Sequence, residues 1–204
     1  MFAGSIVALV TPMDADGGIN YGDLAGLIEF HIDSGTEAFV IAGTTGESAT
    51  LTRDEHIELI ESACALVAGR VPVVAGTGSS STAQTLELSK AVDRCPVDGF
   101  LVVTPYYNKP TQEGLYRHFS LVADAVQRPV ILYNVPGRTG VDLIPGTVVR
   151  LASHDNIVAI KEATGDLERV EPLRDGCGME FKLLSGDDGT SSEFMLSGGN
   201  GCIS

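Results

Sequence analysis

The chain has 204 residues, 44% of them hydrophobic and 20% charged, which is typical of a globular protein with a sizeable core. We therefore expect a single domain over residues 1–204. The formal net charge of −14 argues against nucleic acid and against an anionic membrane surface as partners. No apolar run approaches the roughly 18 residues of a membrane span. No Lys or Arg precedes Arg53, so the basic start of a secretory signal is missing.

The four cysteines are scattered and show no paired short spacing. A disulfide framework or a zinc site would need such pairs. Cys64, Cys95, Cys177 and Cys202 are therefore expected to be reduced thiols, and the protein to be cytoplasmic.

Strand and helix patterns alternate along the whole chain. Apolar runs bounded by turn residues predict eight strands, at residues 5–12, 38–43, 71–78, 99–105, 129–136, 157–163, 181–188 and 201–204. Apolar residues at helical spacing predict the helices between them, at 21–33, 52–67, a segment ending near 94, 111–126, 146–153, 166–174 and 191–196. Thr52 and Glu55 have the spacing of a capping box at a helix start.

Alternating strands and helices predict parallel strands joined by right-handed crossovers, and eight units predict a (β/α)8 TIM barrel. An open doubly wound sheet is the alternative, but no G-x-G-x-x-G follows the first predicted strand. Such barrels typically have about 250 residues. This chain ends inside its eighth predicted strand and lacks an eighth helix, so we expect a truncated barrel, incomplete at its C-terminus, whose closure lies beyond Ser204.

Lys161 lies in the apolar run IVAIKEATGD, residues 157–166. Lysines are almost never fully buried without a partner. One interpretation is an edge strand with the ammonium in solvent. The other is a desolvated amine with a lowered pKa, which can attack a carbonyl carbon and form a Schiff base.

Three further loops lie at predicted carboxyl ends of strands, where barrel enzymes gather their catalytic groups. The loop GTTGE, 43–47, offers hydroxyls and backbone amides to an anion. The loop TPYYNKP, 104–110, presents two phenols, and YNVPGRTG, 133–140, offers a phenol and an arginine on a Pro-Gly turn. Each loop alone has a plain structural interpretation. Together with the lysine they indicate an imine with an α-keto acid, a tyrosine that moves protons and an arginine that binds a second carboxylate.

Other kinds of site are disfavoured, and we expect neither a metal nor an organic cofactor. A metal-dependent aldolase would need histidines at strand ends, but all four lie in predicted helices or loops away from them: His31, His56, His118 and His154. Asp187 and Asp188 lack spaced partners, which favours a turn over a metal site. The segment GTGSSS, 76–81, resembles a phosphate loop without its lysine.

These motifs resemble the family of dihydrodipicolinate synthases (4-hydroxy-tetrahydrodipicolinate synthases), lyases that form a Schiff base. The resemblance covers the chain through VTPM, GTTGE, VAGTG, VTPYYNKP, YNVPGRTG, IKEATGD, LSGDD and GCIS. It implies a TIM barrel followed by a C-terminal helical region. It also implies condensation of pyruvate with L-aspartate 4-semialdehyde in diaminopimelate and lysine biosynthesis, without cofactor, by a homodimer or homotetramer.

The resemblance also assigns roles to matching positions. Lys161 would form the imine with pyruvate, and Tyr133 would transfer protons. Thr44 would link Tyr133 to Tyr107, which would reach into a neighbouring subunit's site. The expected substrate-binding groups are Thr45 for the pyruvate carboxylate, Arg138 for the aldehyde's carboxylate, and the Ile203 carbonyl beside the lysine.

A candidate effector site for lysine follows from the same resemblance, at Ser48, Ala49, His56, Gly78 and Tyr106. Arg53, Ser80 and Gln84 depart from the His, Asn and Glu of the lysine-sensitive pattern. We therefore predict weak or absent inhibition by lysine, because an acidic partner is lost and a positive charge is added.

Two alternatives stay open from the sequence. N-acetylneuraminate lyase and keto-deoxy sugar-acid aldolases share the lysine and tyrosine but take longer, hydroxylated aldehydes; Arg138 within GRTG favours the synthase. The other alternative is a non-catalytic fragment that binds keto acids or a partner subunit.

Overall fold

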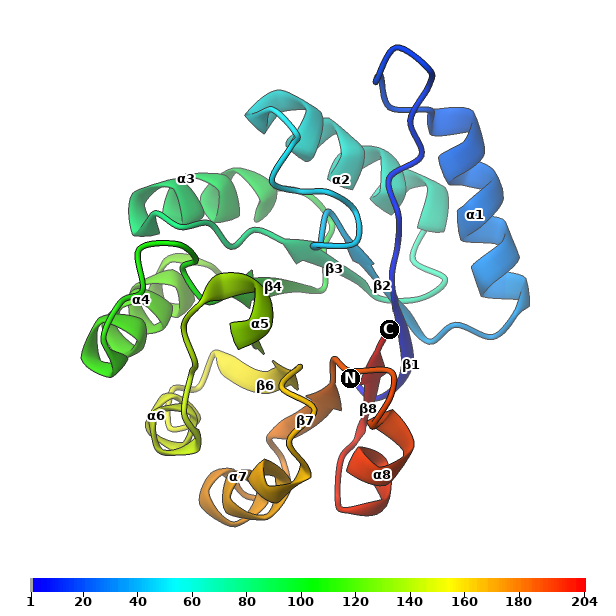
Figure 1. Cartoon of the computed structure of the whole chain (residues 1–204). Helices are drawn as coiled ribbons and strands as arrows, with labels where there is room; N and C mark the ends of the chain where they lie inside the picture. The colour runs from blue at the N-terminus through cyan, green and yellow to red at the C-terminus, as the bar shows by residue number, and fades with distance from the viewer. Residues whose placement is uncertain (1) are drawn as a thin grey trace.

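The structure, a computed structural model, describes residues 2–204. Eight parallel strands in this range form a closed barrel in which each strand pairs with its neighbours in sequence. Their bounds are β1 Gly4–Ala8, β2 Ala38–Ile41, β3 Val73–Gly76, β4 Gly99–Val103, β5 Val130–Asn134, β6 Ile157–Glu162, β7 Lys182–Ser185 and β8 Gly201–Ile203. Figure 1 shows the strands at the centre and the helices around them. The predicted (β/α)8 TIM barrel is confirmed.

The helices connect successive strands on the outside of the barrel. They are α1 Tyr21–Asp33, α2 Arg53–Val67, α3 Thr82–Val92, α4 Gln112–Ala125, α5 Pro136–Thr139, α6 Pro145–Leu151, η1 Leu167–Arg169, α7 Val170–Cys177 and α8 Ser191–Leu196. The predicted capping box is present, since Thr52 and Glu55 cap each other reciprocally at the start of α2. Helix α5 was expected to be a turn. In the part of the chain that the structure describes, no helix has both the length and the apolar character needed to cross a bilayer.

The barrel closes within the chain, contrary to the expectation that closure lies beyond Ser204. β8 pairs with β7 on one side and with β1 on the other, where Ile6 lies opposite Ile203. Gly201 faces Gly4 across this junction, and a Cβ at Gly201 would collide with the Gly4 carbonyl. Because the glycine lets the two backbones approach, a strand of only three residues is long enough to close the sheet.

Apolar side chains form two layers, one on each side of the barrel wall. Ile6, Leu101, Ile131 and Ala159 belong to the cluster inside the barrel. The larger cluster lies between strands and helices, and it includes Phe39, Phe100, Leu115 and Phe119. Successive strand residues alternate between the layers, as the pleat of a strand requires. The barrel interior is thus a packed core, with room for chemistry only at its ends.

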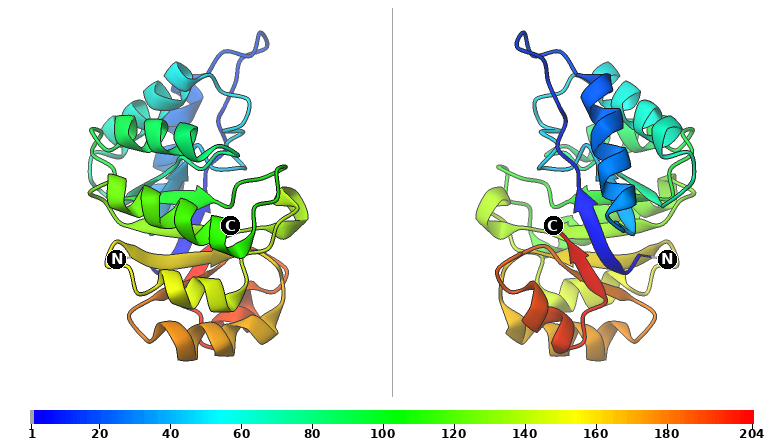
Figure 2. Two further views of the ribbon diagram at one scale, coloured as in Figure 1. Left: turned by 90° about the vertical axis from the view of Figure 1, so that its left-hand side faces the viewer. Right: turned by 90° about the vertical axis from the view of Figure 1, so that its right-hand side faces the viewer.

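Among residues 2–204, no helix covers one sector of the barrel wall. Figure 2 shows β1 and β8 side by side on this face, between α1 and α8. Ser5 on β1 is correspondingly exposed and Val7 is half-buried, whereas Ile6 between them is 1% exposed. The inner layer is therefore complete here, while the outer layer is open to solvent.

Candidate active site

Lys161 and Tyr133 lie side by side inside the carboxyl end of the barrel. β5 and β6 are adjacent, and their register places Tyr133 directly opposite Lys161. The Lys161 Nζ lies 4.6 Å from the centroid of the Tyr133 ring. Both residues were predicted site residues on neighbouring strands, and the structure brings them together.

A bulge in β6 turns Lys161 toward the interior. Val130 pairs with Ile157, but the next residue, Ile131, pairs with Ala159, so Val158 is an extra residue in β6. Ile157 and Ile160 pack in the outer layer, while Val158 and Ala159 both contact the inner one. Strict alternation from Ile157 would have placed Lys161 on the outer face.

The burial of Lys161 is the main electrostatic feature of the site. Lys161 is 6% exposed. The strand β6 pairs with β5 and with β7, so β6 is not the edge strand that one interpretation of the sequence would require. Burial lowers the pKa of the Lys161 amine to about 8; the Asp188 carboxylate opposes this and the Arg138 guanidinium adds to it. A much larger fraction of the amine is therefore neutral near pH 7 than for an exposed lysine. Neutral amine is the nucleophilic form.

Tyr133 has a protonated phenol in the same environment. Burial raises the pKa of Tyr133, while interaction with the Thr44 hydroxyl and the charge of Arg138 lower it in part. The residue is 5% exposed. Its phenol can therefore donate a proton to a group bound at Lys161 and later accept one back.

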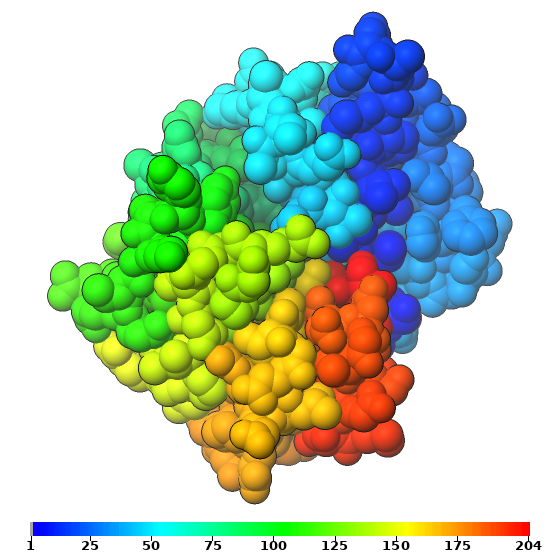
Figure 3. Space-filling model, in the orientation of Figure 1, coloured from blue at the N-terminus to red at the C-terminus, as the bar shows by residue number. Residues whose placement is uncertain are grey.

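The lysine lies in a cavity of about 520 Å³, which we call the lysine cavity. Loops after several strands meet around it, among them the segment 43–52 and α5, drawn in cyan and yellow-green in Figure 3. Its lining includes six predicted residues: Thr44, Thr45, Tyr133, Arg138, Lys161 and Ile203. These come from strand ends β2, β5, β6 and β8, whereas the predicted loop 104–110 after β4 contributes no residue to the lining.

The segment after β2 is folded into a tight turn. Glu47 donates its backbone N–H to the Thr44 carbonyl at 3.0 Å, and Ser48 donates to Gly43 at 3.2 Å. The buried Thr11 hydroxyl donates to the Gly46 carbonyl at 2.7 Å and ties the turn to the segment after β1. The turn therefore presents Thr44 and Thr45 to the lysine cavity from a fixed backbone.

Four residues that follow β7 line the lysine cavity and were missed as site residues: Gly186, Asp187, Asp188 and Gly189. A Cβ on Gly186 would lie 2.7 Å from Lys161 Cε and 2.8 Å from Ala163 Cβ, so only glycine leaves room for the lysine stem. The strand-end rule applied to LSGDD would have found the first three of these positions.

The turn expected at Asp187 is present. Asp187 Oδ2 accepts hydrogen bonds from the backbone N–H of Thr190 at 3.1 Å and from its hydroxyl at 2.8 Å. Asp188 instead acts on Lys161, whose pKa it raises. Across residues 2–204, no group of three or more His, Cys, Asp or Glu is arranged to hold a metal ion.

Tyr107 lies outside the lysine cavity. It is 90% exposed, and its backbone adopts φ 74°, which is unusual for a residue with a side chain. Its backbone N–H donates to the Thr139 carbonyl of α5 at 3.2 Å. The structure thus holds the Tyr107 backbone against the loop that carries Arg138 and leaves the phenol in solvent.

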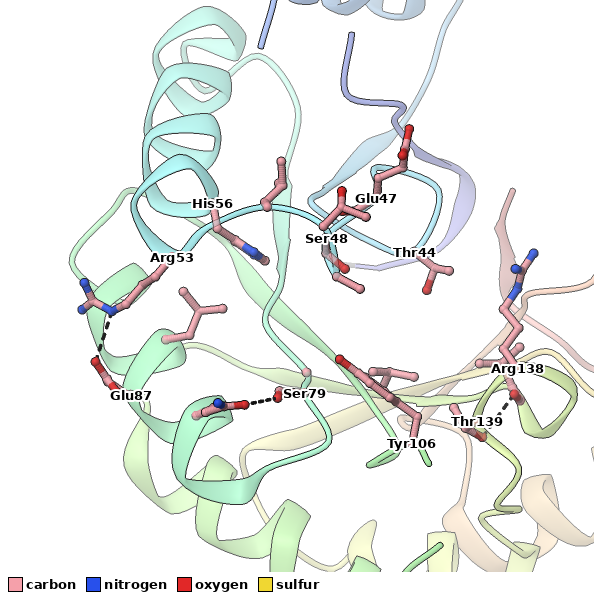
Figure 4. Close-up of a pocket in the computed structure, with 18 residues that line it drawn as sticks. Thr44, Glu47, Ser48, Arg53, His56, Ser79, Glu87, Tyr106, Arg138 and Thr139 are labelled. Atoms are coloured by element: carbon pink, nitrogen blue, oxygen red, sulfur yellow. Dashed lines mark hydrogen bonds and ion pairs between the residues drawn. The ribbon is translucent and has the colours of Figure 1, made fainter. Parts of the chain in front are cut away.

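A second cavity of about 780 Å³, here the side cavity, adjoins the lysine cavity and shares Thr44 and Arg138 with it. Every predicted effector-site residue lines it: Ser48, Ala49, His56, Gly78 and Tyr106. Figure 4 shows Arg53 and Glu87 at one end of this cavity and Arg138 and Thr139 at the other. His56 is buried, and its Nε2 lies 2.7 Å from the Gly76 carbonyl; burial lowers the pKa of its ring.

Two of the residues that depart from the lysine-sensitive pattern also line the side cavity. Gln84 accepts a hydrogen bond from the Ser79 hydroxyl at 2.9 Å. Arg53 is half-exposed and pairs with Glu87 at 3.2 Å. The guanidinium charge is thus partly balanced by Glu87, and the neutral Gln84 carries more of the argument against lysine binding than Arg53 does.

A closed (β/α)8 barrel with a buried lysine of lowered pKa facing a tyrosine defines a lyase that works through a Schiff base. Over residues 1–204 the chain matches the Dihydrodipicolinate synthetase family, and it belongs to that family.

The chain is also similar to individual members. It is 58% identical to the 4-hydroxy-tetrahydrodipicolinate synthase of Thioalkalivibrio sulfidiphilus, over all of this chain and 69% of that protein. It superimposes on dihydrodipicolinate synthase from Acinetobacter baumannii complexed with pyruvate at a TM-score of 0.98, with 51% identity, over all of this chain and 70% of the other. It also superimposes on a monomeric dihydrodipicolinate synthase variant at a TM-score of 0.96, with 38% identity, over all of this chain and 69% of the other.

These comparisons confirm the predicted family, and with it the predicted lyase class and synthase activity. The sugar-acid aldolases and the non-catalytic fragment are not favoured. The individual residue roles remain predictions.

Proposed function

We propose that the protein condenses pyruvate with L-aspartate 4-semialdehyde through an imine at Lys161, in the diaminopimelate and lysine biosynthesis pathway. The observation that carries this is the buried, partly neutral Lys161 amine beside the Tyr133 phenol in an open cavity. The similar Acinetobacter baumannii enzyme, which binds pyruvate, supports the keto acid as first substrate.

The neutral amine of Lys161 attacks the keto carbon of pyruvate, and a C–N bond forms as the carbonyl oxygen takes up a proton. Loss of this oxygen as water leaves the imine. Tyr133, whose pKa is raised by burial, donates the proton to the departing hydroxyl. The Tyr133 phenolate left by this step then accepts a proton from the pyruvate methyl group, which gives an enamine. The enamine forms the new carbon–carbon bond at the aldehyde carbon, and the aldehyde oxygen takes the proton back from Tyr133.

Two groups bind the carboxylates. Thr45 and its backbone amide, on the tight turn after β2, bind the pyruvate carboxylate close to Lys161. Arg138 on α5 binds the carboxylate of the aldehyde substrate through the planar fork of its guanidinium. The Ile203 carbonyl, on the opposite wall of the lysine cavity, stays close to the lysine.

Thr44 links Tyr133 to Tyr107, and Tyr107 completes a proton relay in the lysine cavity of a neighbouring subunit. A 90% exposed phenol on a constrained backbone supports this role, because its side chain is free to reach a neighbouring molecule. The protein is accordingly a homodimer or homotetramer. Analytical ultracentrifugation tests this, and a monomer with full activity would contradict it.

The four free cysteines fit a cytoplasmic location, because thiols stay reduced there. The residues Ser48, Ala49, His56, Gly78 and Tyr106 form an effector site that binds lysine weakly or not at all.

Borohydride trapping tests the central step. The protein is incubated with pyruvate, reduced and digested, and the modified lysine is identified by peptide mass mapping. We expect one adduct, at Lys161, and none in Lys161→Met. Lys182→Arg is the matched control, since this lysine lies on the adjacent strand opposite Ala159. An adduct at Lys182, or none, would contradict the proposal.

A second assay separates the synthase from the sugar-acid aldolases. Turnover of the pyruvate imine is measured with aspartate semialdehyde and with N-acetylmannosamine. We expect turnover only with the former, and loss of it in Arg138→Ala with the pyruvate adduct retained. Turnover with N-acetylmannosamine and none with aspartate semialdehyde would contradict the synthase function and favour an aldolase of the N-acetylneuraminate lyase kind.

A further inference from the structure

The residues that follow Tyr133 and Lys161 form a second pair on the opposite side of the barrel wall. Asn134 lies directly opposite Glu162, one rung beyond the Tyr133–Lys161 pair. Alternation turns Asn134 and Glu162 outward, away from the lysine cavity. Both are buried, at 0% and 3% exposure, so their polar atoms need partners within the protein.

Asn134 uses both ends of its side-chain amide. Its Nδ2 donates to Glu162 Oε2 at 3.1 Å and to Asp142 Oδ1 at 2.8 Å. Its Oδ1 accepts the backbone N–H of Leu143 at 2.9 Å. One side chain therefore ties the end of β5 to the end of β6 and to the residues that follow α5.

Arg169 at the end of η1 holds the two carboxylates of this group together. Its guanidinium donates to Asp142 at 2.9 and 2.6 Å in a bidentate pair, and it lies 3.7 Å from Glu162. Glu162 Oε1 also accepts the backbone N–H of Thr164 at 2.9 Å. Asn134, Asp142, Glu162 and Arg169 thus form one connected group, which we call the outer clamp.

The outer clamp encloses the loop that carries Arg138. Asn134 and Asp142 stand at the two ends of this loop, and the hydrogen bond between their side chains joins the ends. The outer clamp is therefore next in the chain to Tyr133 and Lys161, and it holds both ends of the loop that carries Arg138. These are the three residues to which the proposed reaction assigns roles at β5 and β6. None of the members of the outer clamp lines the lysine cavity.

We propose that the outer clamp positions Lys161, Tyr133 and Arg138 for catalysis, by fixing the ends of β5 and β6 relative to each other and to the loop between Asn134 and Asp142. The proposal rests on the proposed function, in which these three side chains act on pyruvate and the aldehyde. Its members are positioning residues, because they act through the side chains that meet the substrates.

Exchanging the amide and the carboxylate tests the clamp. Asn134→Asp removes two donors and sets a third carboxylate beside Glu162 and Asp142. Glu162→Gln removes the negative charge beside Arg169 and leaves one acceptor oxygen where Glu162 has two. The double variant places a carboxylate on β5 and an amide donor on β6, which restores a hydrogen bond across the rung. Two quantities are measured in the wild type, the two single variants and the double variant: the single-turnover rate of pyruvate adduct formation and the KM for the aldehyde.

We expect each single variant to slow adduct formation at saturating pyruvate by 10-fold or more, and to raise the KM for the aldehyde. The double variant should recover a substantial part of both. Ser89→Ala is the control. The Ser89 hydroxyl donates a hydrogen bond to the Thr77 hydroxyl at 2.8 Å, and both residues are as buried as Asn134 and Glu162. Neither residue is hydrogen-bonded to a member of the outer clamp. Ser89→Ala should lower stability and leave both quantities unchanged.

Folded single variants with wild-type rates would overturn the proposal, as would an equal slowing in Ser89→Ala. If the single variants do not fold, Arg169→Lys serves instead, because it keeps the charge and loses the bidentate pair. It should raise the KM for the aldehyde several-fold, and an unchanged KM would overturn the proposal. Failure of the wild-type protein to form an adduct at Lys161 would instead overturn the proposed function.

Discussion

At the scale of single residues, the site depends on how burial and neighbouring charges set the pKa of the Lys161 amine. Burial is the largest cause of the lowered pKa of the amine, and among the described residues Asp187 and Asp188 supply the acidic side chains that line the same cavity. Arg138 acts in the opposite direction to Asp188. The nucleophile is therefore prepared mainly by exclusion of water, and nearby charges adjust the result.

Replacement of Asp188 should shift the pH dependence of imine formation. The rate of adduct formation at the Lys161 amine should rise with pH to a plateau above about 8, its pKa in the folded protein. Because the Asp188 carboxylate raises this pKa, Asp188→Asn should move the midpoint to lower pH. The measurement is the rate of borohydride trapping against pH. A midpoint that moves upward would contradict the account.

Replacement of Lys161 should stabilise the fold, and more so at neutral than at alkaline pH. The folded pKa of about 8 lies below the value of 10.5 of an exposed lysine. Below pH 8 the ammonium is charged in both states and its burial is unfavourable. Between pH 8 and 10.5 the folded state releases the proton first and the penalty disappears. Lys161→Met should therefore raise the free energy of unfolding by roughly 2–4 kcal/mol at pH 7, and by less at pH 10. Urea denaturation at the two pH values measures this. Equal gains at both pH values would contradict this.

A methyl group at position 186 should block the site without unfolding the barrel. In Gly186→Ala the new Cβ would meet Lys161 Cε and Ala163 Cβ at 2.7 and 2.8 Å. The lysine stem must then move away from Tyr133, so adduct formation should fall by about two orders of magnitude, as misplacement of about 1 Å can cost. Gly146→Ala on α6, where a Cβ would have nothing within 4 Å, is the control. Normal trapping in Gly186→Ala would contradict the steric argument.

At the scale of elements, the sequence predicted types and order well, because strand and helix patterns differ in period. Asn20, Thr52 and Thr111 cap α1, α2 and α4, and the polar residue before a periodic run makes such starts visible. Helix α5 was missed because one turn is too short to show a period. The bulge at Val158 was missed because a continuous apolar run has no alternation to interrupt.

The capping box of α2 offers a measurement at this scale. Thr52 Oγ1 accepts the Glu55 backbone N–H, and Glu55 Oε2 accepts the Thr52 backbone N–H at 2.8 Å. Thr52→Ala removes one of the two reciprocal bonds and should cost about 1 kcal/mol of stability. Chemical denaturation measures it, with Thr52→Ser, which keeps the capping hydroxyl, as the control. A loss no larger than the control's would show that the cap contributes nothing.

At the scale of the whole molecule, barrel closure shows what the sequence could not provide. GCIS reads as a strand beginning at the chain end, and a count of residues suggested that the sheet stays open. The structure closes it because Gly4 and Gly201 let β1 and β8 approach each other. The grouping of Lys161, Tyr133, Arg138 and Thr44 was predictable, because parallel strands in a barrel end at one face. The outer clamp was not, because no strand or helix pattern shows that Asp142 and Arg169 will pack against the outward-facing Asn134 and Glu162.

Inhibition by lysine would act through the proposed effector site, and we expect it to be weak. The side cavity has the expected lining but carries Gln84 in place of an acidic residue. We expect no half-maximal inhibition by lysine below the millimolar range in a steady-state assay. Gln84→Glu should increase the sensitivity, because it returns a partner for the effector's ammonium. Strong inhibition of the unaltered protein would contradict the prediction.

The bulge in β6 has a consequence for how this strand can change in evolution. Between the rungs Val130–Ile157 and Ile131–Ala159, β6 contains one residue more than β5. Loss of Val158 would convert the bulge into regular strand while Lys161 kept its orientation, whereas a second insertion would exchange the facing of Lys161 and Glu162. A deletion of Val158 is therefore expected to keep the amine inside the barrel, whereas an insertion that shifts the register of β6 by one more residue is expected to turn it to the outer face.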